Sequence, residues 1–176
     1  MAFSHLAIAV RDLAANHRFW TEGMGFELVE VLDVPTGVGD GWARHVFYDT
    51  GDGTHVSLLE LHDDTVPDFD PAISRGLGLP GWVNHIAFDA HDAEALDVAR
   101  DRWLAAGLDV VRIDHGRGLS IYAEDPNGNT IEWCWLHEPY TAADQERAAR
   151  RLDGPRVDAG GPEPVLEVFA AAPART

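Results

Sequence analysis

The stretch Val83-Asn84-His85-Ile86-Ala87-Phe88-Asp89-Ala90 repeats a pattern already present at residues 3–10, with His85 lying 80 residues after His5. In both stretches large apolar side chains alternate with histidine or small residues. This alternation predicts two β-strands, each with one face directed toward a core. The other face of the first strand carries His5 and alanines, which would leave open space above a sheet. The segments after each stretch also match in order, so the sequence predicts two copies of one module.

Each predicted module contains a strand, a helix and three further strands. Asp12 and Asp92 stand where helix N-caps are expected, and glycines follow both helices. Turn-forming residues separate the later strands. In the first module the helix is predicted at 13–23 and the later strands at 26–34, 42–49 and 55–62; in the second module the helix is predicted at 93–106 and the strands at 109–113, 119–123 and 129–136.

These predictions divide the chain into four parts and indicate an α+β fold. Residues 1–62 form the first βαβββ module and residues 83–138 the second. Residues 63–82 contain three prolines and form a linker or a lid. Residues 139–176 contain a helix that opens with a capping box at Thr141. A Gly-, Pro- and Ala-rich tail follows, apolar only at 165–169, which is expected to be extended, disordered or laid over a partner subunit.

The composition restricts the classes of partner. Thirteen basic and 30 acidic residues give a formal charge of −17, which disfavours nucleic acids and anionic membranes as ligands. A single cysteine excludes an internal disulfide framework. No apolar run is long enough to span a membrane, and the N-terminus does not resemble a signal peptide. We therefore expect a cytoplasmic protein.

Four side chains at repeated positions are candidate metal ligands. His5 and His85 lie on the first strand of each module, and Glu60 and Glu132 are assigned to equivalent places on the last strand. The turn Asp125-Pro126-Asn127-Gly128 would deliver Glu132 to its strand. If the modules pair by pseudo-twofold symmetry, the four side chains can converge on one cavity. Two imidazoles with one or two carboxylates suit a divalent first-row metal.

The motifs at residues 4–13, 84–88 and 125–132 resemble those of the vicinal oxygen chelate superfamily, which includes glyoxalase I, bleomycin resistance proteins and extradiol dioxygenases. The resemblance covers the chain from about Ser4 to Trp135. It implies two tandem βαβββ modules that form a U-shaped, partly open barrel around a metal site, and it implies a homodimer.

Within this superfamily, residues 113–132 resemble the ring-cleavage signature of one-domain extradiol dioxygenases. The resemblance implies that His5, His85 and Glu132 hold Fe(II) and that His115 and Tyr122 flank a catechol-like substrate. A tyrosine hydroxyl can stabilise reaction intermediates by hydrogen bonding, and a histidine can transfer protons.

Two alternatives to the dioxygenase remain open. Glu60 stands where glyoxalases and epimerases place a fourth ligand or a catalytic base, which favours a lyase or isomerase using Zn(II), Ni(II), Co(II) or Mn(II). A resistance protein that sequesters a small molecule is the third possibility.

His62 could match the acid–base histidine of the dioxygenases, although it lies farther from His85 than their pattern requires.

Overall fold

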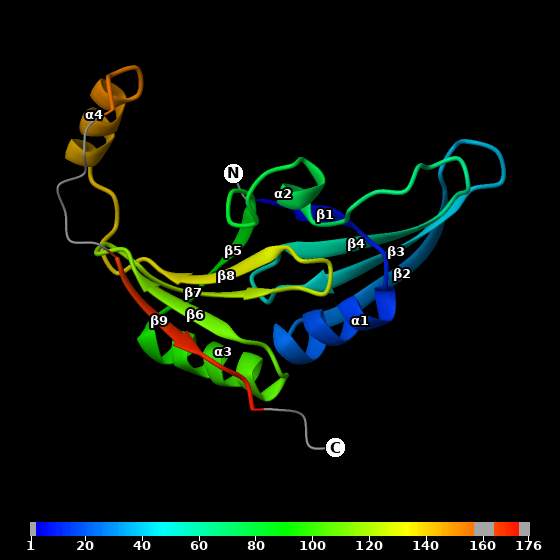
Figure 1. The fold of residues 1–176 in the computed structure, drawn as a ribbon, viewed down its shortest axis with the longest axis horizontal. Helices are drawn as coiled ribbons and strands as arrows, with labels where there is room; N and C mark the ends of the chain where they lie inside the picture. The colour runs from blue at the N-terminus through cyan, green and yellow to red at the C-terminus, as the bar shows by residue number, and fades with distance from the viewer. Residues whose placement is uncertain (1–2, 157–163, 173–176) are drawn as a thin grey trace.

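The computed structural model describes residues 3–156 and 164–172. Figure 1 shows its strands in two groups, with helices on both sides. The elements are β1 (His5–Val10), α1 (Leu13–Arg18), the π-helical turn η1 (Phe19–Gly23), β2 (Glu27–Pro35), β3 (Trp42–Asp49), β4 (His55–His62), α2 (Ile73–Gly76), β5 (His85–Asp89), α3 (Ala93–Ala105), β6 (Val110–Asp114), β7 (Leu119–Glu124), β8 (Thr130–Trp135), α4 (Ala142–Arg151) and β9 (Val165–Phe169).

The strands form two mixed sheets, and the chain has an α+β fold without a closed barrel. Sheet A has the order β1-β4-β3-β2, and sheet B has the order β5-β8-β7-β6-β9. In each sheet the first strand of the module pairs in parallel with its last strand, and the remaining pairs are antiparallel. The predicted order of one strand, one helix and three strands is therefore observed in both halves of the chain.

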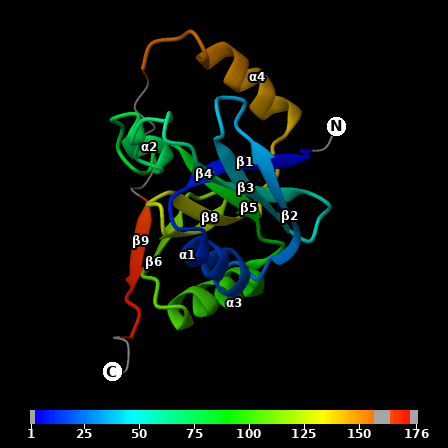
Figure 2. The same cartoon turned by 90° about the vertical axis from the view of Figure 1, so that its right-hand side faces the viewer.

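Helices α1 and α3 lie together on one side of the two sheets, whereas α4 stands apart on the other side (Figures 1 and 2). The apolar strand faces meet the two helices in one continuous core that spans both modules. Trp20 and Trp103 are completely buried there. The rings of Phe26 and Phe88 meet at 5.2 Å between centroids and join the first module to the second. The two modules thus share a core and leave their other sheet faces open.

The helix starts agree with the sequence predictions. Asp12 and Asp92 each accept a hydrogen bond of 2.8 Å from a backbone N–H three residues later, which satisfies a donor at the first turn. Thr141 and Asp144 form the reciprocal capping box of α4. Gly107 has a φ of +83° after α3, a conformation that favours glycine.

The turn before β8 is held by a buried carboxylate. Asp125 accepts hydrogen bonds of 2.8 Å from the backbone N–H groups of both Asn127 and Asn129. Burial raises the pKa of the Asp125 carboxyl. The amide of Asn127 donates to Asn16 of α1 at 3.0 Å, so the turn also fastens the second module to the first. The predicted linker packs here as well, since the backbone N–H of Ile73 donates to Asn129 at 2.7 Å.

The tail contains one further strand. Residues 165–169 form β9, which pairs antiparallel with β6 at the edge of sheet B. The sequence predicted an extended or disordered tail; this apolar segment is extended, and its pairing with β6 was not predicted. Edge pairing satisfies backbone groups of β6 that would otherwise be exposed. Residues 157–163 and 173–176 lie outside the described part of the chain.

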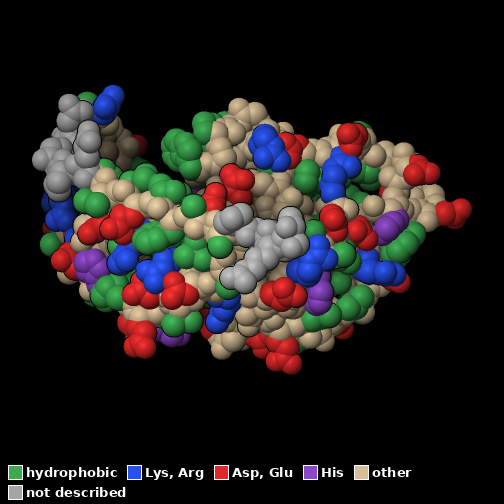
Figure 3. Space-filling view, turned by 60° about the horizontal axis from the view of Figure 1, so that its bottom comes forward, with side chains coloured by type: hydrophobic (Ala, Val, Ile, Leu, Met, Phe, Trp, Pro, Cys, Tyr) green, Lys and Arg blue, Asp and Glu red, His purple; other side chains and the backbone are tan. Residues whose placement is uncertain are grey.

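The surface carries the expected excess of acidic groups. Figure 3 shows Asp and Glu side chains scattered over the helix-bearing face, with basic side chains between them. Among the described residues, no helix has the length and apolar character needed to cross a membrane.

Candidate metal centre

His85 and Glu132 come together on the open face of sheet B. Strand β8 runs parallel to β5 with Ala87 opposite Glu132, so His85 and Glu132 point to the same side of the sheet. His85 Nε2 lies 3.0 Å from Oε2 of Glu132. Only 7% of the Glu132 side chain is exposed, whereas 39% of the His85 side chain is. The predicted pair of candidate ligands is therefore assembled within one sheet.

The hydrogen bonds of His85 identify its tautomer. Nδ1 lies 3.1 Å from the backbone carbonyl of Trp82, which can only accept, so Nδ1 carries a hydrogen. Nε2 faces the Glu132 carboxylate. It carries either a hydrogen, in which case the ring is a protonated imidazolium, or a lone pair, in which case the ring is neutral. A lone pair and a carboxylate at this distance repel each other unless a cation lies close to both. A histidine held by its Nδ1–H on a carbonyl is also the usual state of a metal ligand, so the pair fits a divalent metal.

Tyr122 and His115 extend the pair into a chain of hydrogen bonds. The Tyr122 hydroxyl donates to Oε1 of Glu132 at 3.0 Å. The Tyr122 hydroxyl oxygen lies 3.0 Å from Nε2 of His115; because its hydrogen is given to Glu132, His115 is the donor in that contact. Burial, reinforced by the Glu132 carboxylate, raises the pKa of Tyr122 to about 12. The phenol consequently stays protonated at neutral pH and serves as a hydrogen-bond donor.

His5 lies on the open face of sheet A, not on sheet B. Its Cα partner across the sheet is His55, and its ring meets Phe47 edge-on at 6.0 Å between centroids. The only hydrogen bond of its ring among the described residues is a 3.3 Å contact of Nδ1 with Ser4 Oγ. Nε2 of His5 is therefore available to a ligand outside this sheet.

His45 is a residue that the sequence analysis missed. It lies on β3 two residues before Phe47, whose ring is 4.2 Å away, and its Nε2 is buried without a partner among the described residues. Burial and the neighbouring His5 lower the pKa of His45. The alternation of Trp42–Asp49 would have placed His45 and Phe47 on one face. By the register of the two sheets, Phe47 corresponds to Tyr122 and His45 to Ser120, so the second module has no histidine at this place.

Glu60 does not occupy the position equivalent to Glu132, and this part of the repeat assignment is wrong. In sheet A, Ala7 pairs with Ser57, just as Ala87 pairs with Glu132 in sheet B. Ser57 is thus the counterpart of Glu132. Glu60 lies opposite Val10 and therefore on the face that packs against the helices. Its Oε1 accepts a 3.1 Å hydrogen bond from the backbone N–H of Leu13, at the start of α1.

His62 shares the location of Glu60. Its Nε2 lies 3.0 Å from Oε2 of Glu60, and its ring stacks on Trp42 at 4.0 Å between centroids. The structure therefore separates Glu60 and His62 from His5 and from the His85–Glu132 pair. Neither residue contacts the predicted centre.

The predicted ligands do not meet in a single cluster. Across residues 3–156 and 164–172, no group of three or more His, Cys, Asp and Glu side chains could hold a metal ion. A groove of about 510 Å³ does run between β1, the start of β4 and β5, with His55 and His85 among its lining residues. Each sheet thus carries part of the predicted centre on its open face.

Comparisons with known proteins agree with this fold. Residues 2–133 match the Glyoxalase/Bleomycin resistance protein/Dioxygenase superfamily. A curated relative, 3-methylcatechol 2,3-dioxygenase of Pseudomonas putida, is 24% identical over 136 residues, which is 74% of this chain but 40% of the relative. The chain thus spans less than half of that relative's length.

Two solved structures illustrate the similarity in fold. A glyoxylase/bleomycin resistance protein/dioxygenase domain from Frankia sp. EAN1pec has a TM-score of 0.60 and 22% identity, covering 78% of this chain and 98% of that one. Lactoylglutathione lyase from Agrobacterium tumefaciens has a TM-score of 0.52 and 22% identity, covering 76% of this chain and 92% of that one.

Proposed function

Because the chain belongs to the Glyoxalase/Bleomycin resistance protein/Dioxygenase superfamily, we propose that it is a metal-dependent enzyme that cleaves a catechol-like aromatic ring with O₂. The observation that carries the proposal is the hydrogen-bonded chain from His115 through Tyr122 to Glu132, next to His85. The likeness to a catechol dioxygenase supports the same reaction class.

The proposed ligands are His5, His85 and Glu132. Two neutral imidazoles and one carboxylate offset one of the two charges of a divalent ion and leave coordination positions free. Fe(II) is the metal we favour, and Zn(II), Ni(II), Co(II) and Mn(II) are the competitors that a metal analysis distinguishes. When bound, Fe(II) would offer free coordination positions to a catecholate and O₂ and would pass electrons from the catecholate, which is the species oxidised, to O₂.

Tyr122 and His115 have separate proposed roles, in orienting the carboxylate ligand and in proton exchange. Tyr122 fixes the rotamer of Glu132 through its hydroxyl and presents its edge to the same open face. His115 is exposed, and its Nδ1 is not engaged within the described residues while Nε2–H holds Tyr122. His115 can therefore exchange a proton with substrate at Nδ1 without releasing Tyr122.

The centre is proposed to form between two chains of a homodimer. His5 lies on sheet A, whereas His85 and Glu132 lie on sheet B, and both open faces are turned away from α1 and α3. A second copy related by a twofold axis would set sheet A of one chain against sheet B of the other. Two equivalent centres would result, each taking His5 from one chain.

The lyase or isomerase alternative is weaker in this geometry. Its main support was a carboxylate at the position of Glu60, and Glu60 instead lies against α1 on the opposite face. Ser57, which takes the equivalent place, is a poor ligand and a poor base at neutral pH. The sequestering alternative does not require the ordered His115–Tyr122–Glu132 chain.

The test is oxygen consumption by reconstituted protein. Full-length protein loaded anaerobically with Fe(II) is mixed with catechol or 3-methylcatechol and then with O₂. The proposal expects O₂ uptake together with a yellow ring-cleavage product. Tight binding of Ni(II) or Zn(II), with no O₂ uptake on any catechol after Fe(II) loading, would refute it.

A further inference from the structure

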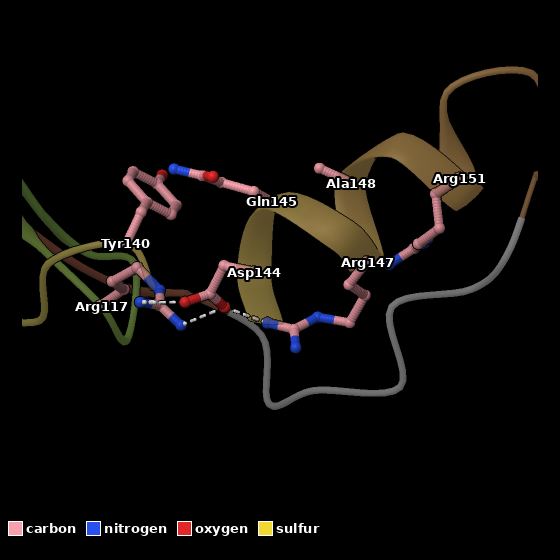
Figure 4. A pocket seen from close by; sticks show the side chains of 7 residues that line it. All are labelled: Arg117, Tyr140, Asp144, Gln145, Arg147, Ala148 and Arg151. Carbon is pink, nitrogen blue, oxygen red and sulfur yellow. Dashed lines mark hydrogen bonds and ion pairs between the residues drawn. The ribbon is translucent and has the colours of Figure 1, made fainter. Parts of the chain in front are cut away.

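A second cavity lies between the turn that joins β6 to β7 and helix α4. Its volume is about 530 Å³, and it is separate from the residues of the candidate metal centre. Arg117 comes from the turn, and the other lining residues come from α4, as far as its last residue, and from the segment before it (Figure 4). The lining residues are Arg117, Tyr140, Asp144, Gln145, Arg147, Ala148 and Arg151.

The cavity carries positive charge in an acidic protein. Asp144 pairs with Arg117 at 3.1 Å and also with Arg147. Hydrogen bonds from Thr141, together with the two arginines, lower the pKa of the Asp144 carboxyl to about 2, so it is ionised at neutral pH. It offsets one of the three guanidinium groups in the lining. The other two give a local positive surplus, although the whole chain has a formal charge of −17.

Two polar side chains in the lining have hydrogen-bonding capacity to spare. Within the described residues, the side chains of Arg151 and Gln145 form no hydrogen bond or ion pair. Figure 4 shows Gln145 reaching toward the ring of Tyr140, while Arg151 lies beyond Arg147 along the helix. A guanidinium presents five N–H donors in a planar fork that matches carboxylate and phosphate oxygens.

The cavity also offers an aromatic surface. Tyr140 is 69% exposed, which is unusual for a large ring, and its face lies 5.1 Å from Cζ of Arg117. No residue of α4 is buried, so the helix contributes little to the core. Arg117, in the turn between β6 and β7, donates to Asp144 of the helix at 3.1 Å and also to the carbonyls of Glu138 and Pro139. Arg117 thus holds the helix in place beside the cavity.

We propose that this cavity binds a small amphipathic anion. Arg147 and Arg151 bind its carboxylate or phosphate group, and its apolar part lies on the ring of Tyr140. This proposal does not depend on the metal centre or on the proposed oxygenase activity. The chain's overall negative charge repels anions in general, so any saturable binding reports a local site.

The experiment is a calorimetric titration of the full-length protein with three probes. Phenyl phosphate combines both recognised features, inorganic phosphate lacks the ring, and benzoate replaces the phosphate by a carboxylate. We expect phenyl phosphate to bind more tightly than inorganic phosphate. Binding of benzoate would assign the site to carboxylates as well. Binding of phenyl phosphate without binding of benzoate would assign it to phosphate esters.

Variants test the assignment residue by residue. Arg151→Ala, which removes no hydrogen bond or ion pair among the described residues, is expected to weaken phenyl phosphate binding by about tenfold, as loss of one charge-assisted hydrogen bond implies. Tyr140→Ala should reduce the affinity for phenyl phosphate to that for inorganic phosphate. Arg150→Ala is the matched control, because Arg150 is on the same helix but pairs with Glu146 outside the cavity. Equal losses in Arg150→Ala and Arg151→Ala, or no saturable binding of any probe, would overturn the proposal.

Discussion

The hydroxyl of Tyr122 donates a hydrogen bond of 3.0 Å to Oε1 of Glu132, which leaves Oε2 directed at His85. The two carboxylate oxygens therefore have different partners, and the hydrogen bond from Tyr122 fixes the rotamer of Glu132. Groups that orient a metal ligand in this way contribute to affinity although they do not touch the ion.

Replacing this tyrosine should weaken metal binding without unfolding the protein. Tyr122→Phe is expected to reduce Fe(II) affinity about 10- to 100-fold, the usual effect of losing an outer partner of a ligand. The measurement is a competition titration against a chelator, with the circular dichroism spectrum as the control for folding. An unchanged affinity would show that Tyr122 does not orient the ligand.

The register of β4 leads to opposite predictions for two glutamates. Glu132→Gln should abolish stoichiometric metal binding, because a proposed ligand loses its charge. Glu60→Gln should leave the metal content intact and instead lower the free energy of unfolding by about 0.3–1 kcal/mol, as the start of α1 loses a negative charge while the amide oxygen can still accept from Leu13. Metal analysis and urea denaturation measure the two effects. Loss of metal from Glu60→Gln would return Glu60 to the ligand set.

The sequence predicted the modules well because alternation and capping are local signals. It also predicted that His85 and Glu132 lie near each other, and the observed register puts both, with Tyr122, on one face of sheet B. It misplaced Glu60 because register depends on hairpin lengths and core packing, and a shift of three residues moves a side chain to the other face. The similar surroundings of Glu60 and Glu132, an apolar residue on each side, concealed that shift.

The position of His45 and the pairing of strand β9 could not be predicted from the repeated sequence pattern. His45 is partly buried near His5 only because β3 pairs with β4 in the observed register. Strand β9 depends on an unpaired edge of β6, which a one-dimensional pattern does not reveal. Both are consequences of tertiary pairing rather than of local propensity.

The buried tyrosines predict a loss of stability at alkaline pH. Burial raises the pKa of Tyr48 and of Tyr122 to about 12, whereas a tyrosine in an unfolded chain ionises near pH 10. The folded state therefore holds these protons more tightly, and their contribution to stability is complete below about pH 10 and is lost as the pH rises toward 12. Urea denaturation across this range should show the decline.

A variant assigns this decline to a residue. Tyr48 is fully buried, and its hydroxyl lies 3.0 Å from Nδ1 of His17. Tyr48→Phe should be less stable at neutral pH by about 0.5–1.5 kcal/mol, through the lost hydrogen bond. Its stability should also fall less steeply above pH 10. A slope equal to that of the unmodified protein would show that Tyr48 does not keep its proton.

The division of the proposed ligands between two sheets can be tested by mixing variants. His5→Ala and Glu132→Ala should each be inactive, since each removes a ligand from every centre. If a centre takes His5 from one chain and His85 and Glu132 from the other, a mixed dimer contains one intact centre and one that lacks both ligands. Random exchange makes half of the dimers mixed, so an equimolar mixture should recover about one quarter of the unmodified activity. Centres formed within one chain would give no recovery, and the Fe(II) content of the mixture should follow the same rule.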